Sequence, residues 1–428
     1  MLSLQMKRIM INKLFSEEKH LLNVTIVITL IWIVMQAIII AFFWGTPQFS
    51  DPGRYIYDAI QCYNSNKWYP MSESIYSHFI WAPGFINYLI LQLNLFGTIN
   101  FNAIFNLFIN IAILLEVFYI ANKFFSKRTA LISVILFCSI FSNSFVVLGA
   151  NSDLPFLFFC LSALCLIFSG KWKNIFFAAI FLAIANWIRP LAIIFIFAAI
   201  LYFIFSKAKY YNYLTLIILY ISTLFAIGSI TEHYTGYFIY QSSTSGFNLI
   251  MTYNDEATGA IGSTEEVHFI ENIDSLTFVE RDSIWKEKAV NWIKENPLNS
   301  IVLYLKKIPA MYIHDGWATW SFWELPVAGE VFSDSSKVAK FRTGFIVKTI
   351  VSIPYYFTFL LFFYSLFINR KKIININLVL LFVPLIGTLI SAIFPAGTRY
   401  HYPFMFVIII FGAWGVNTWI ETKKMNHK

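Results

Sequence analysis

The sequence predicts an all-α polytopic membrane protein with about ten transmembrane helices. Of its 428 residues, 58% are hydrophobic and only 13% are charged, whereas a soluble domain carries about 25% charged residues. Apolar runs long enough to cross a hydrocarbon core recur along the chain. Lys and Arg collect between these runs, as they do in cytoplasmic loops. We therefore assign the net charge of +8 to membrane topology, and nucleic acid is not an expected partner.

The first apolar run, residues 22–43, is predicted to be a retained transmembrane helix. It is longer than the apolar core of a signal peptide, which has about 7–15 residues. The sequence Trp44-Gly45-Thr46-Pro47 follows it, in place of a small-residue cleavage site. Lys7, Arg8, Lys13 and Lys19 precede it. The N-terminus is therefore predicted to be cytoplasmic.

The segment 80–97 decides the topology of everything that follows. It is apolar but short, so it can either span the membrane or lie in the interface. An interfacial helix places the later basic clusters, at 123–128, 171–173 and 370–372, on the cytoplasmic side, and we therefore prefer it. Both termini are then cytoplasmic. The predicted spans are residues 22–43, 101–122, 130–149, 154–170, 174–190, 191–206, 212–230, 344–368, 374–393 and 402–420.

Three parts are expected along the chain. Residues 1–230 form an N-terminal transmembrane catalytic module that includes a first outer loop, 45–100, with interfacial helices. Residues 231–342 form a mixed extracytoplasmic region, rich in acids, with amphipathic helices on the membrane surface. Residues 343–428 form the C-terminal transmembrane helices. The four cysteines have no metal-ligand or redox spacing, and no P-loop or GxGxxG pattern occurs.

Charged and polar residues recur at the outer ends of the predicted helices. Such residues near a bilayer are costly and usually mark function, although a single arginine at a helix end often only extends to the lipid headgroups. A set of acids and bases on one side is predicted to form a site. Its members are Asp51, Arg54, Asp58, Asp153, Arg189, Arg399, Tyr400 and His401.

This set of residues suits a lipid phosphate and a hydroxyl group. Arginine neutralises a phosphate and can bind it through two N–H groups. A carboxylate can take the proton of an attacking hydroxyl. Direct displacement of a phosphate from the anomeric carbon of a sugar inverts that carbon and needs no glycosyl-enzyme intermediate. Other chemistry is compatible with the same residues.

Several motifs occur in a characteristic order. Asp51-x-x-Arg54-Tyr55 follows the first predicted span, and a Pro-Gly-containing helix, "WAPGFINYLILQLNLFG", comes next. "NSDLPF", with Asp153, and Arg189-Pro190 come later. After them come "GFNLIMTYNDEATGAIG", "KAVNWIKENPLNSIVLYLKK" and Arg399-Tyr400. Over residues 20–420 this order resembles the GT-C membrane glycosyltransferases, in particular the branch related to aminoarabinose transferase and protein O-mannosyltransferases.

The resemblance implies roles for three residues: Asp51 matches the catalytic base, Asp153 matches a second acid, and Arg54 positions the phosphate or Asp51. We further expect Arg189 and Arg399 to hold the phosphate and Asp153 to orient the acceptor or an arginine. Alternatives stay open for several residues. Asp51 also suits the turn in Ser-Asp-Pro-Gly, and Asp58 either shares a helical face with Asp51 or is an interfacial acid. Arg399 and His401 each either bind phosphate or anchor the last hairpin. The remaining assigned substrate-binding residues are Tyr55 and Tyr400.

The predicted function is that of an inverting glycosyltransferase, hexosyl or pentosyl, in the plasma membrane. It moves a sugar from a polyprenyl-phosphate donor to a hydroxyl group on the extracytoplasmic face. The acceptor is an envelope glycan, a lipid or a protein, and membrane lipid surrounds the chain. No cofactor is assigned, and a divalent metal on Asp51 and Asp153 is left open.

Two other classes of protein compete with this prediction. A transporter or flippase of lipid-linked sugars needs polar residues at mid-membrane and often has internal repeats, whereas the charges here gather at one face. A polysaccharide polymerase or ligase also carries a large outer region. The Asp51-x-x-Arg54-Tyr55 motif favours the GT-C class over it.

Overall fold

The chain is all-helical in the residues that its computed structural model describes. These are residues 2–48, 50–71, 79–259, 267, 269–318, 348–395 and 397–426, without the side chains of residues 2–17 and 375. Every named element in these ranges is an α- or 3-10 helix, and an isolated bridge joins Ile80 to Ser243. The predicted all-α class is confirmed.

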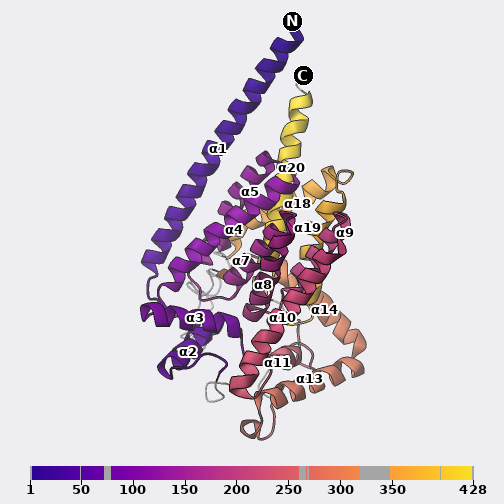
Figure 1. Ribbon diagram of the computed structural model, residues 1–428. Coiled ribbons are helices and arrows are strands. Elements are labelled where there is room, and N and C mark those ends of the chain that lie inside the picture. The colour runs from indigo at the N-terminus through magenta and orange to yellow at the C-terminus, as the bar shows by residue number, and fades with distance from the viewer. Residues whose placement is uncertain are drawn as a thin grey trace, which may run out of the picture.

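The long helices lie side by side in one bundle (Figure 1). Within the described residues, five stretches are long and apolar enough to cross a membrane: Glu18–Phe42, Asn102–Phe124, Tyr210–Thr235, Lys348–Ile368 and Thr398–Met425. The bundle helices are α1 Leu2–Phe42, α4 Asn102–Phe124, α5 Lys127–Ser139, α7 Asp153–Phe168, α8 Trp172–Ile188, α9 Ile193–Phe205, α10 Tyr210–Thr235, α18 Ile353–Ile368, α19 Asn375–Ser391 and α20 Met405–Asn426. The shorter apolar helices lie in α7, α8, α9 and α19.

The other elements lie mainly at the end of the bundle away from the start of α1 and the end of α20 (Figure 1). α3 lies across this end beside α2, as an interfacial helix would, and does not run along the bundle. Gly84 allows this packing, because a Cβ there would come within 2.4 Å of the Trp187 ring on α8. These elements are α2 Ser50–Asn64, α3 Pro83–Phe96, α6 Phe141–Phe145, α11 Ser245–Ile250, η2 Ile273–Ser275, α13 Phe278–Glu295, α14 Pro297–Tyr312 and η3 Thr398–Phe404.

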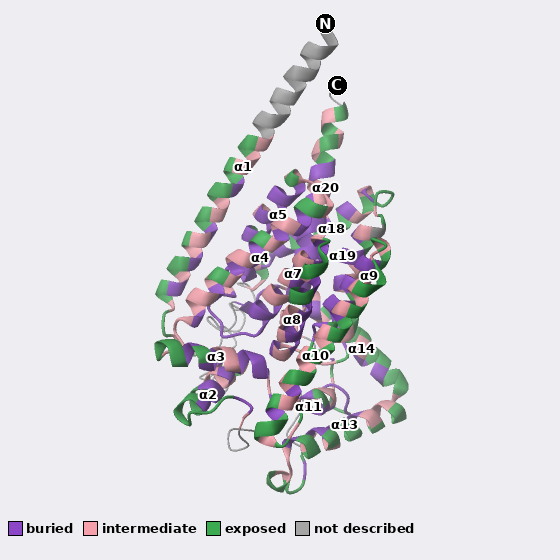
Figure 2. Cartoon of the chain, viewed as in Figure 1, coloured by how far each residue is buried: buried purple, intermediate pink, exposed green. Residues whose placement is uncertain are grey.

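α20 is the central helix of the bundle. Residues 405–413 are all buried, whereas α1, α10 and α18 expose long apolar side chains such as Leu30, Ile221 and Leu360 (Figure 2). Exposed apolar surface of this extent is expected where lipid is the solvent. Because η3 precedes α20 directly, the start of the central helix fixes the position of Arg399.

The predicted span 130–149 is not one continuous helix, because α5 ends at Ser139 and Ile140 is extended. Asparagines of α4 compensate for the lost helical hydrogen bonds. Asn110 donates to the Asn143 carbonyl at 2.5 Å, and Asn106 donates to the Val147 and Gly149 carbonyls at 3.0 Å each. Unpaired backbone groups are costly in a membrane interior, and these side chains make the break tolerable. The residues after the break lead directly to Asp153.

The predicted outer region 231–342 contributes α11, α13 and α14. α13 begins with a capping box, in which the Thr277 hydroxyl accepts from the Glu280 amide and the Glu280 carboxylate accepts from the Thr277 amide. Pro297 then occupies the first turn of α14, where its missing N–H is not needed. Residues 260–266, 268 and 319–342 of the predicted region lie outside the described residues.

Candidate active site

A cavity of about 360 Å³ lies where the start of α2 and the segment through α11 meet the bundle. Its walls come from segments that are far apart in the sequence: the start of α2, the residues before α3, the end of α8, the segment through α11, and the end of α19 with η3. Its lining residues are Asp51, Tyr55, Trp81, Ala82, Ser152, Ile188, Arg189, Pro190, Leu191, Gln241, Ser242, Thr244, Ser245, Phe247, Asn248, Met251, Ser391, Phe394, Pro395, Arg399 and Tyr400.

Two carboxylates and two guanidiniums form one connected cluster at this cavity. Arg399 donates from Nη1 to Asp51 Oδ2 at 2.9 Å and from Nε to Asp153 Oδ2. Arg189 donates from Nη1 to the other oxygen of Asp153. Four residues that the sequence placed at outer helix ends thus meet at one point.

The two carboxylates have different surroundings. The Asp153 side chain is fully buried, and both of its oxygens accept from arginines. The Asp51 side chain is 43% exposed and faces the cavity. Each carboxylate lies in the first turn of a helix, where the helix dipole stabilises negative charge. Asp153 is therefore placed to hold the arginines, and Asp51 is placed to meet a substrate.

Tyr55 and Tyr400 line the cavity beside the charged cluster. The Arg189 guanidinium lies over the Tyr400 ring, 5.0 Å from its centroid. Tyr55 packs edge-on against Trp81 and Phe85, with centroids 6.0 Å and 5.4 Å away. Burial, and then the charge of Asp51, raise the pKa of Tyr55 well above its usual range, so its phenol stays neutral.

Arg54 and Asp58 do not line the cavity. Arg54 Nε pairs with the Asp58 carboxylate at 3.1 Å, four residues on along α2. Asp58 is buried, and desolvation raises its pKa while Arg54 lowers it. The expected helix does run from Asp51 through Asp58. Seven residues advance the chain by about 10 Å, however, and this rise carries Asp58 away from the cluster.

His401 is buried behind the cavity and does not line it. Its Nδ1 donates to the Met311 carbonyl at 2.6 Å, and its Nε2 lies 3.1 Å from Asp315 Oδ1. The Ser142 hydroxyl donates to the other oxygen of Asp315 at 2.5 Å. Both ring nitrogens therefore face acceptors, and the ring joins η3 to the end of α14. Of its two predicted roles, this geometry matches that of an anchor.

Polar residues of the segment 241–248 line the cavity, and no ligand was predicted for any of them, although Asn248 lies in the motif "GFNLIMTYNDEATGAIG". Gln241, Ser242, Thr244, Ser245 and Asn248 all face the cavity. The available signal was the run "QSSTSGFN", a dense set of hydroxyl and carboxamide residues shortly after a predicted span. Trp81 and Phe247 add aromatic surface to the same cavity.

The donor set does not match a metal site. Arg399 bonds both Asp51 and Asp153, so a guanidinium occupies the position where a cation would have to bridge them. Within the described residues, no group of three His, Cys, Asp or Glu side chains gathers. We therefore derive no step through a metal ion.

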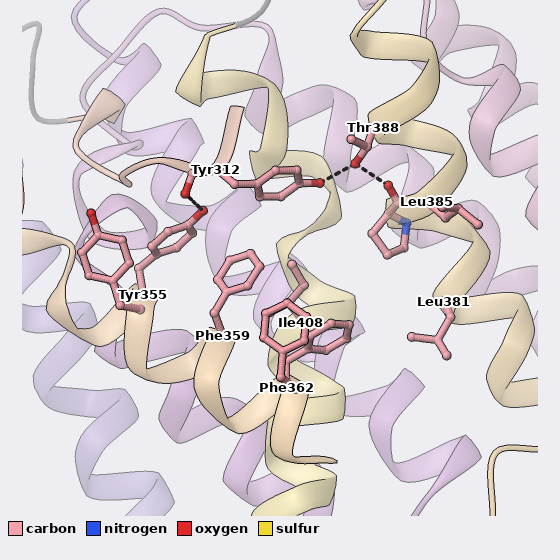
Figure 3. A pocket seen from close by; sticks show the side chains of 11 residues that line it. Tyr312, Tyr355, Phe359, Phe362, Leu381, Leu385, Thr388 and Ile408 are labelled. Atoms are coloured by element: carbon pink, nitrogen blue, oxygen red, sulfur yellow. Dashed lines mark hydrogen bonds between the residues drawn. The ribbon is translucent and has the colours of Figure 1, made fainter. Parts of the chain in front are cut away.

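A second cavity, of about 450 Å³, lies between α18, α19 and α20. Its walls are largely aromatic and aliphatic, with Tyr355, Phe359, Phe362 and Leu381 among them (Figure 3). At one end the Tyr312 hydroxyl bonds the Thr388 hydroxyl at 2.5 Å. Thr388 precedes Ser391, which lines the polar cavity, by less than one turn of α19. The two cavities therefore follow one another along this helix.

No family model and no curated protein matches the sequence. Solved structures with a similar arrangement include the archaeal oligosaccharyltransferase AglB from Archaeoglobus fulgidus, in complex with an inhibitory peptide and a dolichol-phosphate. It has 12% identity and a TM-score of 0.47, covering 94% of this chain and 51% of that one. ArnT from Cupriavidus metallidurans, in the apo state, has 10% identity and a TM-score of 0.48, covering 90% and 59%.

Both neighbours are membrane glycosyltransferases of the GT-C superfamily, the class that the sequence motifs resemble. The chain spans about half the length of the AglB structures that it matches. At these identities and TM-scores the likeness does not transfer chemistry. The function is therefore inferred from the residues of this chain.

Proposed function

We propose that this protein is an inverting glycosyltransferase that takes a sugar from a polyprenyl-phosphate donor and transfers it to a hydroxyl group at the outer face of the membrane. The observation that carries the proposal is the meeting of Asp51, Arg189 and Arg399 in one cavity. An accessible carboxylate beside two guanidiniums is what an acceptor hydroxyl and a departing phosphate require.

Arg189 and Arg399 bind the phosphate of the donor. A guanidinium has five N–H donors, and the hydrogen bonds to Asp51 and Asp153 use two on Arg399 and one on Arg189. The other N–H groups are available to phosphate oxygens. Asp153 fixes the orientation of both guanidinium planes, so less conformational entropy is lost when the donor binds.

Asp51 takes the proton of the acceptor. The acceptor oxygen forms a bond to the anomeric carbon, while the bond from that carbon to the phosphate oxygen breaks. The proton of the hydroxyl passes to the Asp51 carboxylate, and the electron pair of the broken bond leaves with the polyprenyl phosphate. The arginines stabilise the charge that develops on the leaving phosphate. One displacement inverts the anomeric carbon.

The apolar cavity of Figure 3 receives the first part of the polyprenyl chain. Its aromatic and aliphatic lining matches a hydrocarbon, and α19 leads from it to the polar cavity. A lipid seated there has its phosphate end directed toward η3, where Arg399 lies.

The basic loops support an extracytoplasmic position for the site. Lys123 lies in the last turn of α4, Arg128 lies in the first turn of α5, and Arg370 follows α18. The ends of α4 and α18 and the start of α5 lie away from α2 and α3 (Figure 1). Under the positive-inside rule those ends are cytoplasmic. The acceptor is then a glycan, lipid or protein of the envelope.

The test uses the purified protein in lipid nanodiscs with synthetic short-chain polyprenyl phosphates carrying different sugars. Release of polyprenyl phosphate is followed by mass spectrometry, with an envelope extract as the source of acceptor. We expect Asp51→Asn to lower the rate by about 10²–10⁴-fold, with unchanged membrane insertion. Glu271→Gln, an exposed acid of the outer region, is the matched control and should keep full activity. Full activity of Asp51→Asn would refute the base assignment.

A further inference from the structure

The lining of the active-site cavity is divided by charge. Its ionic groups are Asp51, Arg189 and Arg399, to which the proposed function assigns the acceptor proton and the phosphate. The segment from Gln241 to Asn248 contributes only hydroxyl, carboxamide and aromatic groups. The second set has no role in the displacement described above, and we call it the neutral wall: Gln241, Ser242, Thr244, Ser245 and Asn248.

Hydrogen bonds hold the neutral wall from the side of α3 and α8. Gln241 Oε1 accepts from Asn186 Nδ2 at 3.1 Å, and Ser242 Oγ accepts from the Ala82 amide at 3.0 Å. The Ser243 amide donates to the Ile80 carbonyl at 2.9 Å. Asn248 Nδ2 donates to Thr244 Oγ1 within the wall, at 3.2 Å. These polar groups are therefore oriented before any ligand binds.

α13 holds the neutral wall from the other side. Asp282 accepts from Ser245 Oγ at 3.0 Å and from the amides of Gly246 and Phe247 at 2.8 Å and 3.2 Å. The contact is close, because a Cβ on Gly246 would lie 1.8 Å from the Asp282 carbonyl oxygen. Only glycine allows this approach. The wall is thus a rigid part of the cavity, as a specificity-determining surface must be.

Aromatic rings complete this side of the cavity. Phe79 lies between Trp81 and Phe247, with ring centroids 4.9 Å and 4.6 Å away. Trp81 and Phe247 both line the cavity. Aromatic surface together with a few fixed polar groups is the usual composition of a site for a small polar ligand. Sugars have this dual character, with apolar C–H faces and a rim of hydroxyl groups.

We infer that the neutral wall binds the sugar of the donor and selects an uncharged one, whose substituents are hydroxyl or acetamido groups. This inference rests on the proposed function. A carboxylate or ammonium group on the sugar would have to leave water for neutral partners, which is costly for an ion. The ionic groups of the cavity are already in ion pairs, Asp51 with Arg399 and Arg189 with Asp153. The proposed function assigns Asp51 to the acceptor proton and the two arginines to the phosphate.

The test measures equilibrium binding of synthetic lipids to the purified protein in nanodiscs. The probes are a short-chain polyprenyl phosphate alone and the same lipid linked to glucose, mannose, galactose, N-acetylglucosamine, glucuronic acid or 4-amino-4-deoxyarabinose. We expect at least one uncharged sugar to tighten binding tenfold or more over the bare lipid phosphate. The two charged sugars should bind no more tightly than the bare lipid phosphate.

The variants Gln241→Ala and Asn248→Ala should each lose the gain from the sugar and keep the affinity for the bare lipid phosphate. Ser243→Ala is the matched control, because Ser243 belongs to the same segment and does not line the cavity. It should keep both affinities.

The outcomes separate this inference from the proposed function. Tighter binding of a charged sugar than of the bare lipid phosphate would overturn the selection of an uncharged sugar. No gain from any lipid-linked sugar would overturn the assignment of the neutral wall to the donor, and binding of free methyl glycosides would then assign the wall to the acceptor. Failure of the bare lipid phosphate to bind would instead refute the proposed function.

Discussion

Replacing Asp153 by asparagine tests whether this buried carboxylate organises the active site. The side chain is fully buried and accepts from Arg189 and Arg399 on its two oxygens. Asparagine has nearly the same shape but no charge, and its Nδ2 group would point a donor at one of the two guanidiniums. The substitution therefore leaves Arg189 without its carboxylate and Arg399 with Asp51 alone.

The expected effect on stability follows from this geometry. Removing one partner of a buried ion pair costs about 3–5 kcal/mol, because the other charge stays buried without compensation. An unfolding entropy of about 2.1 cal/mol/K per residue gives roughly 0.9 kcal/mol/K for 428 residues. The melting temperature should therefore fall by about 3–6 °C. Transfer should fall by about 100-fold or more, because the guanidiniums lose their orientation.

The assay is thermal unfolding of the purified protein in nanodiscs, followed by tryptophan fluorescence, together with the transfer rate. The double variant Asp153→Asn with Arg189→Gln serves as an internal control, because it removes the guanidinium that the single variant leaves unpaired. It should melt at a higher temperature than Asp153→Asn alone, yet remain inactive. A single variant with wild-type melting temperature and wild-type transfer would show that Asp153 does not hold the arginines.

Three further predictions concern residues outside the cluster. Burial lowers the pKa of Lys307 to about 8, below the value of about 10.5 for a free lysine. As the pH rises, the folded protein loses this proton before the unfolded protein does. The stability of the wild type should therefore increase from pH 8 to 10.5. Lys307→Met should be more stable than the wild type below pH 8, by up to about 3 kcal/mol, and should lack this increase with pH. Melting temperatures of the two proteins that change in parallel over pH 7–10 would contradict the prediction. Arg54→Gln should lower stability by about 1 kcal/mol or less, because the ion pair of Arg54 with Asp58 is partly exposed. It should change the affinity for polyprenyl phosphate by less than twofold, and a tenfold loss would show that Arg54 belongs to the phosphate site. His401→Ala leaves Asp315 buried without its ring partner, so the melting temperature should fall by about 3 °C or more, and an unchanged value would show that this contact does not anchor η3.

Apolar runs and charge predicted much of the fold and part of the site. Long apolar stretches correspond to helices such as α4 and α10, because a bilayer admits few other structures. Charges at helix ends predicted that Asp51, Asp153, Arg189 and Arg399 belong together. The break between α5 and α6 was not predicted, since it depends on Asn106 and Asn110 of α4.

Three features of the site differ in how far they can be predicted from the sequence. The pairing of Arg54 with Asp58 could be predicted from the sequence, because opposite charges four residues apart on a helix are neighbours. The different surroundings of Asp51 and Asp153 could not be predicted, since they depend on burial and on Arg399, which is 246 residues away from Asp153 in the sequence. The neutral wall likewise depends on contacts between distant segments, such as the bridge between Ile80 and Ser243, which the sequence does not predict.

The central claim is that Asp51, Arg189 and Arg399 form one site for a lipid-linked sugar. The most direct measurement is a cryo-EM map of the protein in nanodiscs with a bound polyprenyl-phosphate sugar and the Asp51→Asn substitution to slow turnover. The account predicts phosphate density about 3 Å from the guanidiniums of Arg189 and Arg399, with the anomeric carbon facing residue 51. Phosphate density bound elsewhere, or a sugar directed away from residue 51, would contradict it.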